Sequence, residues 1–154
     1  MTLNIGDPLP DFRLPADGGS ILSKADLRGR KVVLYFYPKD DTPGCTKEAQ
    51  GFRDAATEFA AAGTTVIGVS KDSVASHDKF KAKHGLNFHL LSDQDGCLCE
   101  SSGVWVEKSM YGKRYMGIER ATVLAGADGT VRRVWRKVKV PGHVAEVLAA
   151  AQAL

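Results

Sequence analysis

The sequence has little cysteine, little excess charge and no long hydrophobic run, and each scarcity argues against a class of protein. Its three cysteines, at positions 45, 97 and 99, are an odd number with a spacing unlike a disulfide framework. A net charge of only +3 gives no strong case for nucleic acid or an anionic membrane as a partner. No stretch is long enough to span a bilayer, and the opening MTLNIGDPLPDF lacks the features of a signal peptide. We therefore expect a cytoplasmic protein.

The length and composition suit one globular domain. The 154 residues are 44% hydrophobic and 25% charged, a balance typical of globular proteins rather than of disordered or membrane ones. A chain of this length buries roughly 70% of its unfolded surface without disulfide staples. Because no linker, repeat or low-complexity segment stands out, we predict a single domain over residues 1–154.

The first half of the chain alternates strand and helix patterns. Residues 32–37, VVLYFY, are a β-branched and aromatic run that predicts a strand buried on both faces. The pattern continues with a helix over residues 42–62, a strand over 64–70, a helix over 73–85 and a strand over 87–92. Such connections are right-handed crossovers between parallel strands. The C-terminal ends of the strands should therefore share one edge, where functional loops collect.

The remaining segments add strands and helices around this sheet. In chain order the patterns predict an extended arm or edge hairpin over residues 6–19, one helical turn over 23–27, a short helix over 95–102, a polar loop over 106–115, strands over 118–125 and 130–137, and a terminal helix from Pro141. The last two strands flank a glycine-containing turn, which makes them an antiparallel hairpin. The expected class is α/β, with a central mixed sheet flanked by helices.

Cys45 is the leading candidate for a reactive residue. Thr42 and Pro43 form a strong helix start, with Thr42 expected to accept a backbone N–H bond as N-cap and Pro43 at the first helical position. Cys45 then lies in the first turn, where unpaired N–H groups and the helix dipole favour a thiolate. The alternative is a buried structural cysteine, which the polar neighbours at positions 40–44 argue against.

The residues after Cys45 exclude dithiol exchange at one site. A thioredoxin-type centre needs Cys-x-x-Cys at such a helix start, but here the order is Cys45-Thr46-Lys47-Glu48. What remains is a single activated thiolate, an arrangement suited to attack on an electrophile.

These residues carry a family resemblance. Pro38, Thr42 and Cys45 in PKDDTPGC match the Pro-x-x-x-Thr-x-x-Cys motif of the peroxiredoxins. The wider pattern, with GDPLPDF, MYGKRYMGIER and VPGH before the last helix, resembles the bacterioferritin comigratory protein or peroxiredoxin Q subfamily over nearly the whole chain. The resemblance implies a thioredoxin-like fold and reduction of hydrogen peroxide or organic hydroperoxides, without a metal or organic cofactor.

The resemblance also implies roles for individual residues. Cys45 would be the peroxidatic nucleophile that becomes a sulfenic acid. The other implied site residues are Thr42 as hydrogen-bond partner of the peroxide, Pro38 shaping and shielding the pocket, Arg120 stabilising thiolate and transition state, Glu48 holding the helix and the arginine, and Pro43 and Gly44 in support. Without the resemblance, Arg120 would be an ordinary arginine in a strand-like run.

The cysteine that would resolve the sulfenic acid is missing from both positions used in this subfamily, which carry Gln50 and Lys81 here. Cys97 and Cys99 follow the third strand on the active edge, so either is a candidate, although both also suit ordinary small helix residues. We favour a one-cysteine mechanism with an external reductant, glutathione, glutaredoxin or thioredoxin. The resemblance also suggests a monomer.

A metal site, a nucleic-acid site and a non-enzymatic function are the alternatives to this interpretation. The histidines at 77, 84, 89 and 143 do not form a ligand set of metal-site spacing. The basic stretch around Trp135, RRVWRKVK, fits a strand with cations facing water better than a nucleic-acid site. A non-enzymatic binding or holdase module on the same fold is the alternative from another functional class.

Overall fold

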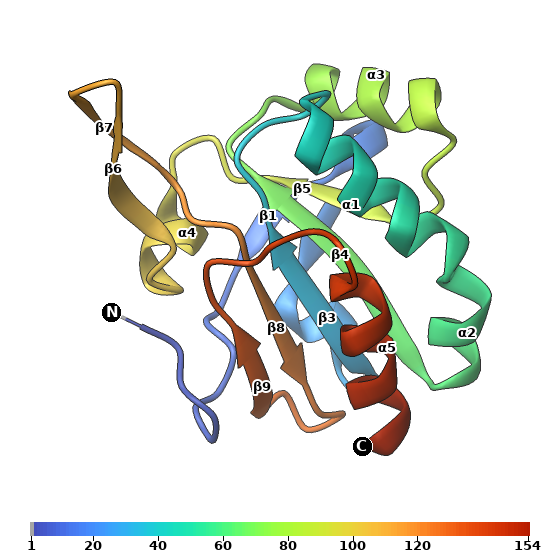
Figure 1. Ribbon diagram of the computed structural model, residues 1–154. Helices are drawn as coiled ribbons and strands as arrows, with labels where there is room; N and C mark the ends of the chain where they lie inside the picture. Colours follow the sequence, from blue (N-terminus) through green and yellow to red (C-terminus); the bar gives the residue numbers. More distant parts are fainter. Residues whose placement is uncertain (1) are drawn as a thin grey trace.

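The centre of the structure is a five-stranded mixed sheet, seen in a computed structural model that describes residues 2–154 (Figure 1). Its strands in spatial order are β5 (His89–Ser92), β4 (Thr64–Ser70), β3 (Lys31–Phe36), β8 (Ala121–Ala125) and β9 (Val131–Trp135). The first three are parallel, whereas β8 and β9 run antiparallel to their neighbours. The predicted mixed sheet with parallel crossover strands is confirmed.

Helices and two small hairpins surround this sheet. The α-helices are α1 (Pro43–Asp54), α2 (Ala56–Ala61), α3 (Val74–His84), α4 (Cys97–Ser101) and α5 (His143–Ala153). The smaller elements are β1 (Arg13–Pro15), η1 (Asp17–Gly19), β2 (Ile21–Ser23), η2 (Lys24–Leu27), β6 (Trp105–Met110) and β7 (Lys113–Ile118). The extended arm or edge hairpin predicted over residues 6–19 is confirmed in part, because β1 pairs antiparallel with β2 but β2 lies beyond residue 19. The single turn of η2 confirms the helical turn predicted over residues 23–27.

Side-chain alternation along β3 divides the hydrophobic core into two clusters. Val33 and Tyr35 face a cluster that also contains Cys45 and residues of α1, α2 and α5. Val32 and Leu34 face the other cluster, which includes Cys99, the N-terminal segment and α4. Because successive side chains of a strand point to opposite faces, the two cysteines belong to opposite sides of the sheet. In Figure 1, α1 and α5 lie on one side and the N-terminal segment on the other.

The helix predicted over residues 42–62 is interrupted. It divides at Ala55, whose ψ of 5° leaves the helical region, into α1 and α2. Alanine is the strongest helix former, so local propensity gives no sign of this break. Phe52 and Phe59, on either side of it, are both buried in the same cluster. We attribute the interruption to packing against the sheet.

The polar loop predicted over residues 106–115 is wrong, because β6 and β7 form an antiparallel hairpin there. The turn between them is Tyr111-Gly112, and both residues have positive φ, 53° and 78°. Two residues with positive φ are what a two-residue type I′ hairpin requires. The sequence concealed this turn because tyrosine is rare at positive φ and because the flanking strands are largely exposed.

Several element boundaries also differ from the prediction. The strand expected over 118–125 is two strands, since β7 ends at Ile118 and β8 begins at Ala121, which leaves Arg120 in the connection. The strand expected over 130–137 is β9, which is shorter at both ends. Pro141 does not open the last helix, because Gly142 is the N-cap of α5 and the helix begins at His143. The predicted cap of α3 at Ser73 is confirmed by its bond from the Ser76 N–H.

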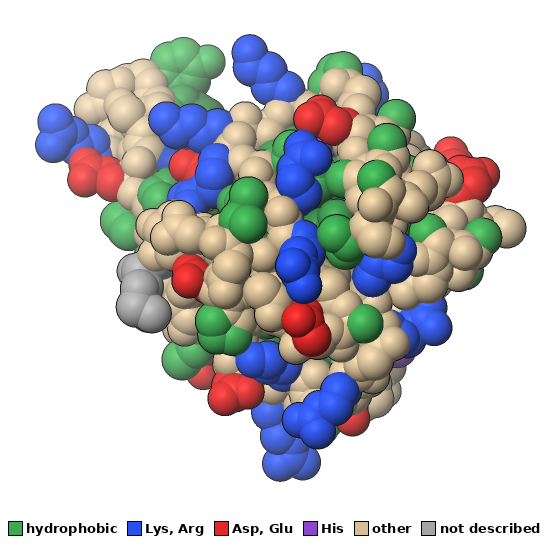
Figure 2. Space-filling view, turned by 90° about the horizontal axis from the view of Figure 1, so that it is seen from below, with side chains coloured by type: hydrophobic (Ala, Val, Ile, Leu, Met, Phe, Trp, Pro, Cys, Tyr) green, Lys and Arg blue, Asp and Glu red, His purple; other side chains and the backbone are tan. Residues whose placement is uncertain are grey.

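Charged side chains of both signs are mixed on the face of the molecule that Figure 2 shows from below. On this face Lys and Arg side chains lie among acidic, hydrophobic and uncharged groups. Within residues 2–154, none of the helices combines the length and apolar character needed to cross a membrane.

Candidate active site

Cys45 lies in the first turn of α1, as predicted. The Thr46 N–H donates to the Thr42 carbonyl at 2.8 Å, so the N–H groups of Gly44 and Cys45 come before the first bonded residue of the helix. Such N–H groups and the positive end of the helix dipole favour an anion at this position. The Cys45 side chain is nearly buried, with 1% exposure, and water is largely excluded from the sulfur.

The Arg120 guanidinium joins Cys45 to Glu48. Its Nη2 donates to Cys45 Sγ at 3.3 Å, and its Nη1 donates to Glu48 Oε1 at 2.7 Å. The backbone around it is fixed, because the Glu119 N–H donates to the Val104 carbonyl and the Val138 N–H donates to the Arg120 carbonyl. Arg120 therefore presents a planar pair of donors in a set orientation, which a lysine could not reproduce.

Glu48 is a fully buried carboxylate with one partner. Its side chain has 0% exposure, and Oε2 has no hydrogen-bond partner among the described residues. Burial raises the pKa of Glu48 to about 7, although the charge and hydrogen bond of Arg120 act to lower it. Glu48 therefore changes charge close to neutral pH while it orients the arginine.

Gly44 and Pro43 shape the start of the helix. A Cβ atom at Gly44 would lie 3.2 Å from Arg120 Nη2, tighter than ordinary packing allows. Glycine at this position therefore lets the guanidinium approach the helix end. Pro43 is exposed and stands at the first helical position, where its missing N–H removes no helical bond.

Thr42 is the N-cap of α1, as predicted, but the capping hydrogen bond predicted for its side chain is wrong. Thr42 has the extended backbone of an N-cap, but its side chain accepts no capping bond. Instead its Oγ1 donates to the Lys39 carbonyl at 2.9 Å. The hydroxyl proton is thus committed to the loop, and the oxygen lone pairs remain for other donors. Pro38 is exposed just after β3, and its shielding role stays a prediction.

Lys108 has a place near the site that the sequence pattern did not indicate, because the pattern predicted a loop there. It lies on β6 and is partly buried, and burial together with the positive charge of Arg120 lowers its pKa. The charge of Cys45 acts on it in the opposite direction. Lys108, on a strand that the local pattern did not reveal, is therefore within electrostatic reach of Arg120 and Cys45.

The other two cysteines differ from Cys45 in their surroundings. All three cysteines are free thiols. Cys99 has 0% exposure, and burial raises its pKa far above the ordinary value. Cys97 is exposed on α4, and a hydrogen bond with Asp95 raises its pKa. Both thiols are therefore weakly ionised near neutral pH.

The four histidines are spread over separate partners. His77 contacts Asp40, His84 contacts Asp41, His89 contacts Asp17, and His143 contacts Thr122. In the chain between residues 2 and 154 no two of them share a partner.

Lys81 is paired with Asp17 at 2.6 Å. It occupies one of the two positions that the resemblance gives for a resolving cysteine.

The chain is similar to known proteins over most of its length. Residues 5–134 match the AhpC/TSA family. The chain is 56% identical to a protein of Coxiella burnetii named putative peroxiredoxin bcp, over 96% of this chain and 98% of that one. It is 51% identical to peroxiredoxin Bcp of Bacillus subtilis, over 96% and 94% of the two chains.

Solved structures show the same fold. The bacterioferritin comigratory protein of Xanthomonas campestris, a structure described in terms of its alkyl peroxide reduction activity, superposes with a TM-score of 0.88 at 48% identity, covering 92% of this chain and 90% of that one. A cysteine-to-serine mutant of Xylella fastidiosa PrxQ gives 0.94 at 43% identity, covering 99% and 98%. The fold is thus thioredoxin-like, as the resemblance implied. The chain belongs to the AhpC/TSA family and, within it, to the thiol-dependent peroxidases of the peroxiredoxin Bcp/PrxQ type.

Proposed function

We propose that this protein reduces hydrogen peroxide and alkyl hydroperoxides through a sulfenic acid at Cys45, which an external thiol then reduces. The observation that carries the proposal is the 3.3 Å contact between Arg120 Nη2 and Cys45 Sγ, with the same guanidinium held by Glu48. A buried sulfur at a helix start, paired with a fixed cation, has the features of an activated nucleophile.

In the first step the Cys45 thiolate attacks the nearer peroxide oxygen. An S–O bond forms and the O–O bond breaks, so that sulfur is oxidised and the peroxide is reduced. The departing oxygen leaves as hydroxide or alkoxide and takes a proton to become water or an alcohol. The sulfur keeps the other oxygen as a sulfenic acid.

Charge moves during this step from the sulfur to the departing oxygen. We propose that Arg120 and the free N–H groups of Gly44 and Cys45 donate hydrogen bonds to the departing oxygen as it becomes negative. Donors of this kind stabilise a transition state by several kcal/mol. Thr42 has lone pairs available to accept a hydrogen bond from the peroxide O–H. Pro38 is proposed to limit water at the mouth of the site.

The substrate range rests on the relatives. The Xanthomonas campestris protein is described as reducing alkyl peroxides, and this chain shares 48% of its aligned residues with it. We therefore include alkyl hydroperoxides beside hydrogen peroxide as substrates.

In the second step an external thiol attacks the sulfenic sulfur, releases water and forms a mixed disulfide, and a second thiol then regenerates Cys45. Three features favour this one-cysteine route. Gln50 and Lys81 occupy the positions of the usual resolving cysteines, Cys99 lies in the core on the other side of the sheet, and Cys97 is held beside Asp95. Thioredoxin, glutaredoxin and glutathione are the reductants proposed, for a monomeric, single-domain protein of the cytoplasm.

The test is peroxide consumption by the purified protein with each thiol reductant in turn. We expect consumption of hydrogen peroxide and of an alkyl hydroperoxide by the unmodified chain and by the Cys97→Ser variant, which is the matched control. Cys45→Ser should abolish both activities. Full activity of Cys45→Ser would refute the proposal, and loss of activity in Cys97→Ser would favour a two-cysteine mechanism instead.

A further inference from the structure

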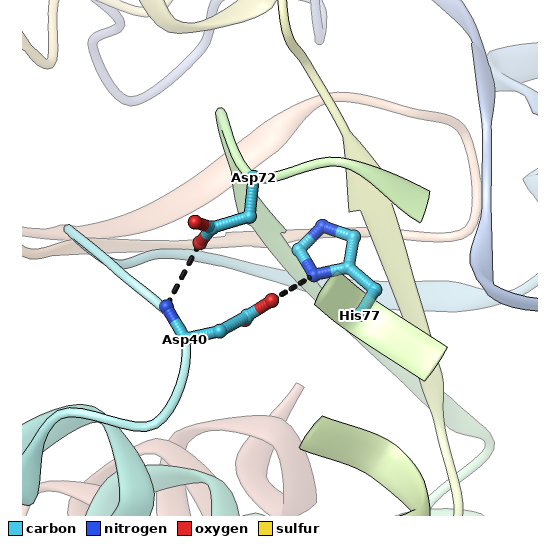
Figure 3. Close-up of side chains that lie close together, drawn as sticks. All are labelled: Asp40, Asp72 and His77. Carbon is cyan, nitrogen blue, oxygen red and sulfur yellow. Dashed lines mark hydrogen bonds and ion pairs between the residues drawn. The ribbon is translucent and has the colours of Figure 1, made fainter. Parts of the chain in front are cut away.

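The loop between β3 and α1, residues 38–42, is held by a buried carboxylate at its centre. Asp40 accepts hydrogen bonds from the Tyr37 hydroxyl at 2.5 Å, from the Ser76 hydroxyl at 2.8 Å and from His77 Nδ1 at 2.7 Å. Its own backbone N–H donates to Asp72 Oδ2 at 2.8 Å. Figure 3 shows the bonds from Asp40 to Asp72 and His77. The loop that precedes Cys45 is thus tied to α3 and to the end of β4.

His77 stands between two groups that can only accept hydrogen bonds. Its Nδ1 faces Asp40 Oδ2, and its Nε2 lies 2.9 Å from the carbonyl oxygen of Leu91 in β5. A neutral imidazole has one donor and one acceptor nitrogen, so next to an ionised Asp40 only the doubly protonated ring satisfies both contacts. The side chain has 0% exposure. His77 and Asp40 therefore form a buried ion pair.

The other titratable groups around this ring support its positive charge. Burial lowers the pKa of His77, but the hydrogen bond and charge of Asp40, the Leu91 carbonyl and the charge of Asp72 outweigh burial and raise it. The Tyr37 hydroxyl lies 3.5 Å from Nδ1 and donates a hydrogen bond to Asp40. Burial raises the pKa of Tyr37 well above the ordinary value. The charges and hydrogen bonds that face His77 therefore favour its protonated form.

Asp40, Asp72 and His77 are also residue types that bind metals, and their ligand atoms lie within 4.8 Å of one another. Their hydrogen bonds leave little for a cation. The Nδ1 atom of His77 that faces Asp40 is protonated, Asp40 accepts three donors, and Asp72 Oδ2 accepts from Asp40 and from Ser70. Hydrogen bonds within the protein therefore account for the arrangement of these three side chains.

We propose that His77 and Asp40 are a positioning pair for the peroxidase reaction, which fixes the residue 38–42 loop and thereby sets Cys45 against Arg120. Neither residue touches the reacting atoms. Their effect passes through the backbone that carries Thr42 and the first turn of α1, in which Cys45 lies. The inference rests on the proposed function, because it concerns the geometry in which Cys45 meets peroxide.

Two substitutions of His77 separate the two contacts of the ring. The His77→Asn variant would place an amide N–H where Nδ1 lies and keep a bond to Asp40, whereas the His77→Gln variant places its amide near Nε2 and loses Asp40. We expect His77→Gln to slow Cys45 oxidation by about tenfold or more, as small misplacements of reacting groups do. We expect His77→Asn to recover most of that rate.

The matched control is His89→Gln. His89 also pairs with a carboxylate, Asp17 Oδ1 at 3.1 Å, but it is half-exposed and lies outside the hydrogen bonds that hold the loop. Oxidation should be followed by stopped flow under single turnover, with reduction of the sulfenic acid measured separately. A positioning role predicts slowed oxidation with unchanged reduction in His77→Gln and neither effect in His89→Gln. Equal losses in both steps, or none, would overturn the inference.

A measurement on the unmodified protein guards against variants that do not fold. Nitrogen-15 NMR of the histidine side chains should show both ring nitrogens of His77 protonated at pH 7. A neutral tautomer would overturn the ion pair. The two proposals fail separately: an inactive wild-type protein refutes the peroxidase function, whereas an active wild type with an equally active His77→Gln refutes only the positioning role.

Discussion

Removal of the Arg120 side chain should damage catalysis and stability through two different contacts. In Arg120→Met the sulfur loses the donor that now lies 3.3 Å from it, and Glu48 loses its single described partner. The first loss concerns the reaction and the second concerns the folded state. A second substitution at Glu48 can therefore separate them.

The catalytic effect can be estimated from the Arg120–Cys45 contact. Unit charges 3.3 Å apart attract by about 5 kcal/mol at an effective dielectric constant of about 20. Water screens part of this, because the Arg120 side chain is 16% exposed. A hydrogen bond to a charged group contributes about 1.5–3 kcal/mol. We therefore expect about 2–3 kcal/mol less transition-state stabilisation, a fall of about 30- to 150-fold in the rate of Cys45 oxidation.

The stability effect follows from the buried carboxylate. Breaking a buried ion pair by removal of one partner costs about 3–5 kcal/mol, and Glu48 has 0% exposure. Glu48 can take up a proton, which brings the expected loss toward the lower end of that range. The double variant Arg120→Met/Glu48→Gln carries no buried charge and should recover much of the unfolding free energy, but none of the oxidation rate.

Urea denaturation and stopped-flow oxidation of the same samples test this prediction. The matched control is Arg136→Met, because Arg136 also pairs with a glutamate at 2.7 Å, in this case Glu119, but among the described residues it makes no hydrogen bond to Cys45. It should change the oxidation rate by no more than about threefold. If the double variant regains the oxidation rate along with its stability, Arg120 acts only by supporting the fold and the reasoning is refuted.

Gly44, Glu48 and Cys99 supply three more predictions. In Gly44→Ala the new methyl group would displace Arg120 Nη2, which lies 3.2 Å from the place that a Cβ atom would take, and should slow oxidation by about tenfold with an unchanged circular dichroism spectrum; an unchanged rate would contradict the close approach. Burial raises the pKa of Glu48 from 4.5 to about 7, so the folded protein binds more protons at Glu48 than the unfolded chain does between these pH values. The stability that Glu48 contributes is therefore present below pH 4.5 and lost as pH rises through 7. Glu48→Gln should remove this pH dependence of the unfolding free energy, measured by urea denaturation between pH 4.5 and 7. Cys99→Ser should lower the melting temperature, since the side chain is buried, yet leave the oxidation rate unchanged, and a fall in that rate would link Cys99 to the chemistry.

The central sheet and the position of Cys45 could be predicted because their signals are local. The hydrophobic run of β3 and the Thr42-Pro43 helix start each lie within a few residues. They place the sulfur in the first helical turn at the sheet edge. Arg120 could be assigned only by resemblance, since its contact with Cys45 spans 75 residues and the run around it resembles an ordinary strand.

The features that escaped prediction depend on contacts between distant segments. The β6–β7 hairpin has exposed strands and a Tyr111 turn, so its sequence resembles a loop and the position of Lys108 was hidden. The break at Ala55 has no signal in local propensity, because alanine is a strong helix former. The bond between Asp40 and His77 joins positions 37 residues apart, and nothing in the helical spacing of His77 distinguishes it from a core residue.

The most direct test of the Cys45 mechanism is intact-mass measurement and peptide mapping after one equivalent of peroxide without reductant. We predict one added oxygen on the Cys45 peptide, trapped by a sulfenic-acid reagent, with Cys97 and Cys99 still reduced. An intramolecular disulfide from Cys45 to either of these cysteines, or oxidation that leaves Cys45 unmodified, would contradict the mechanism.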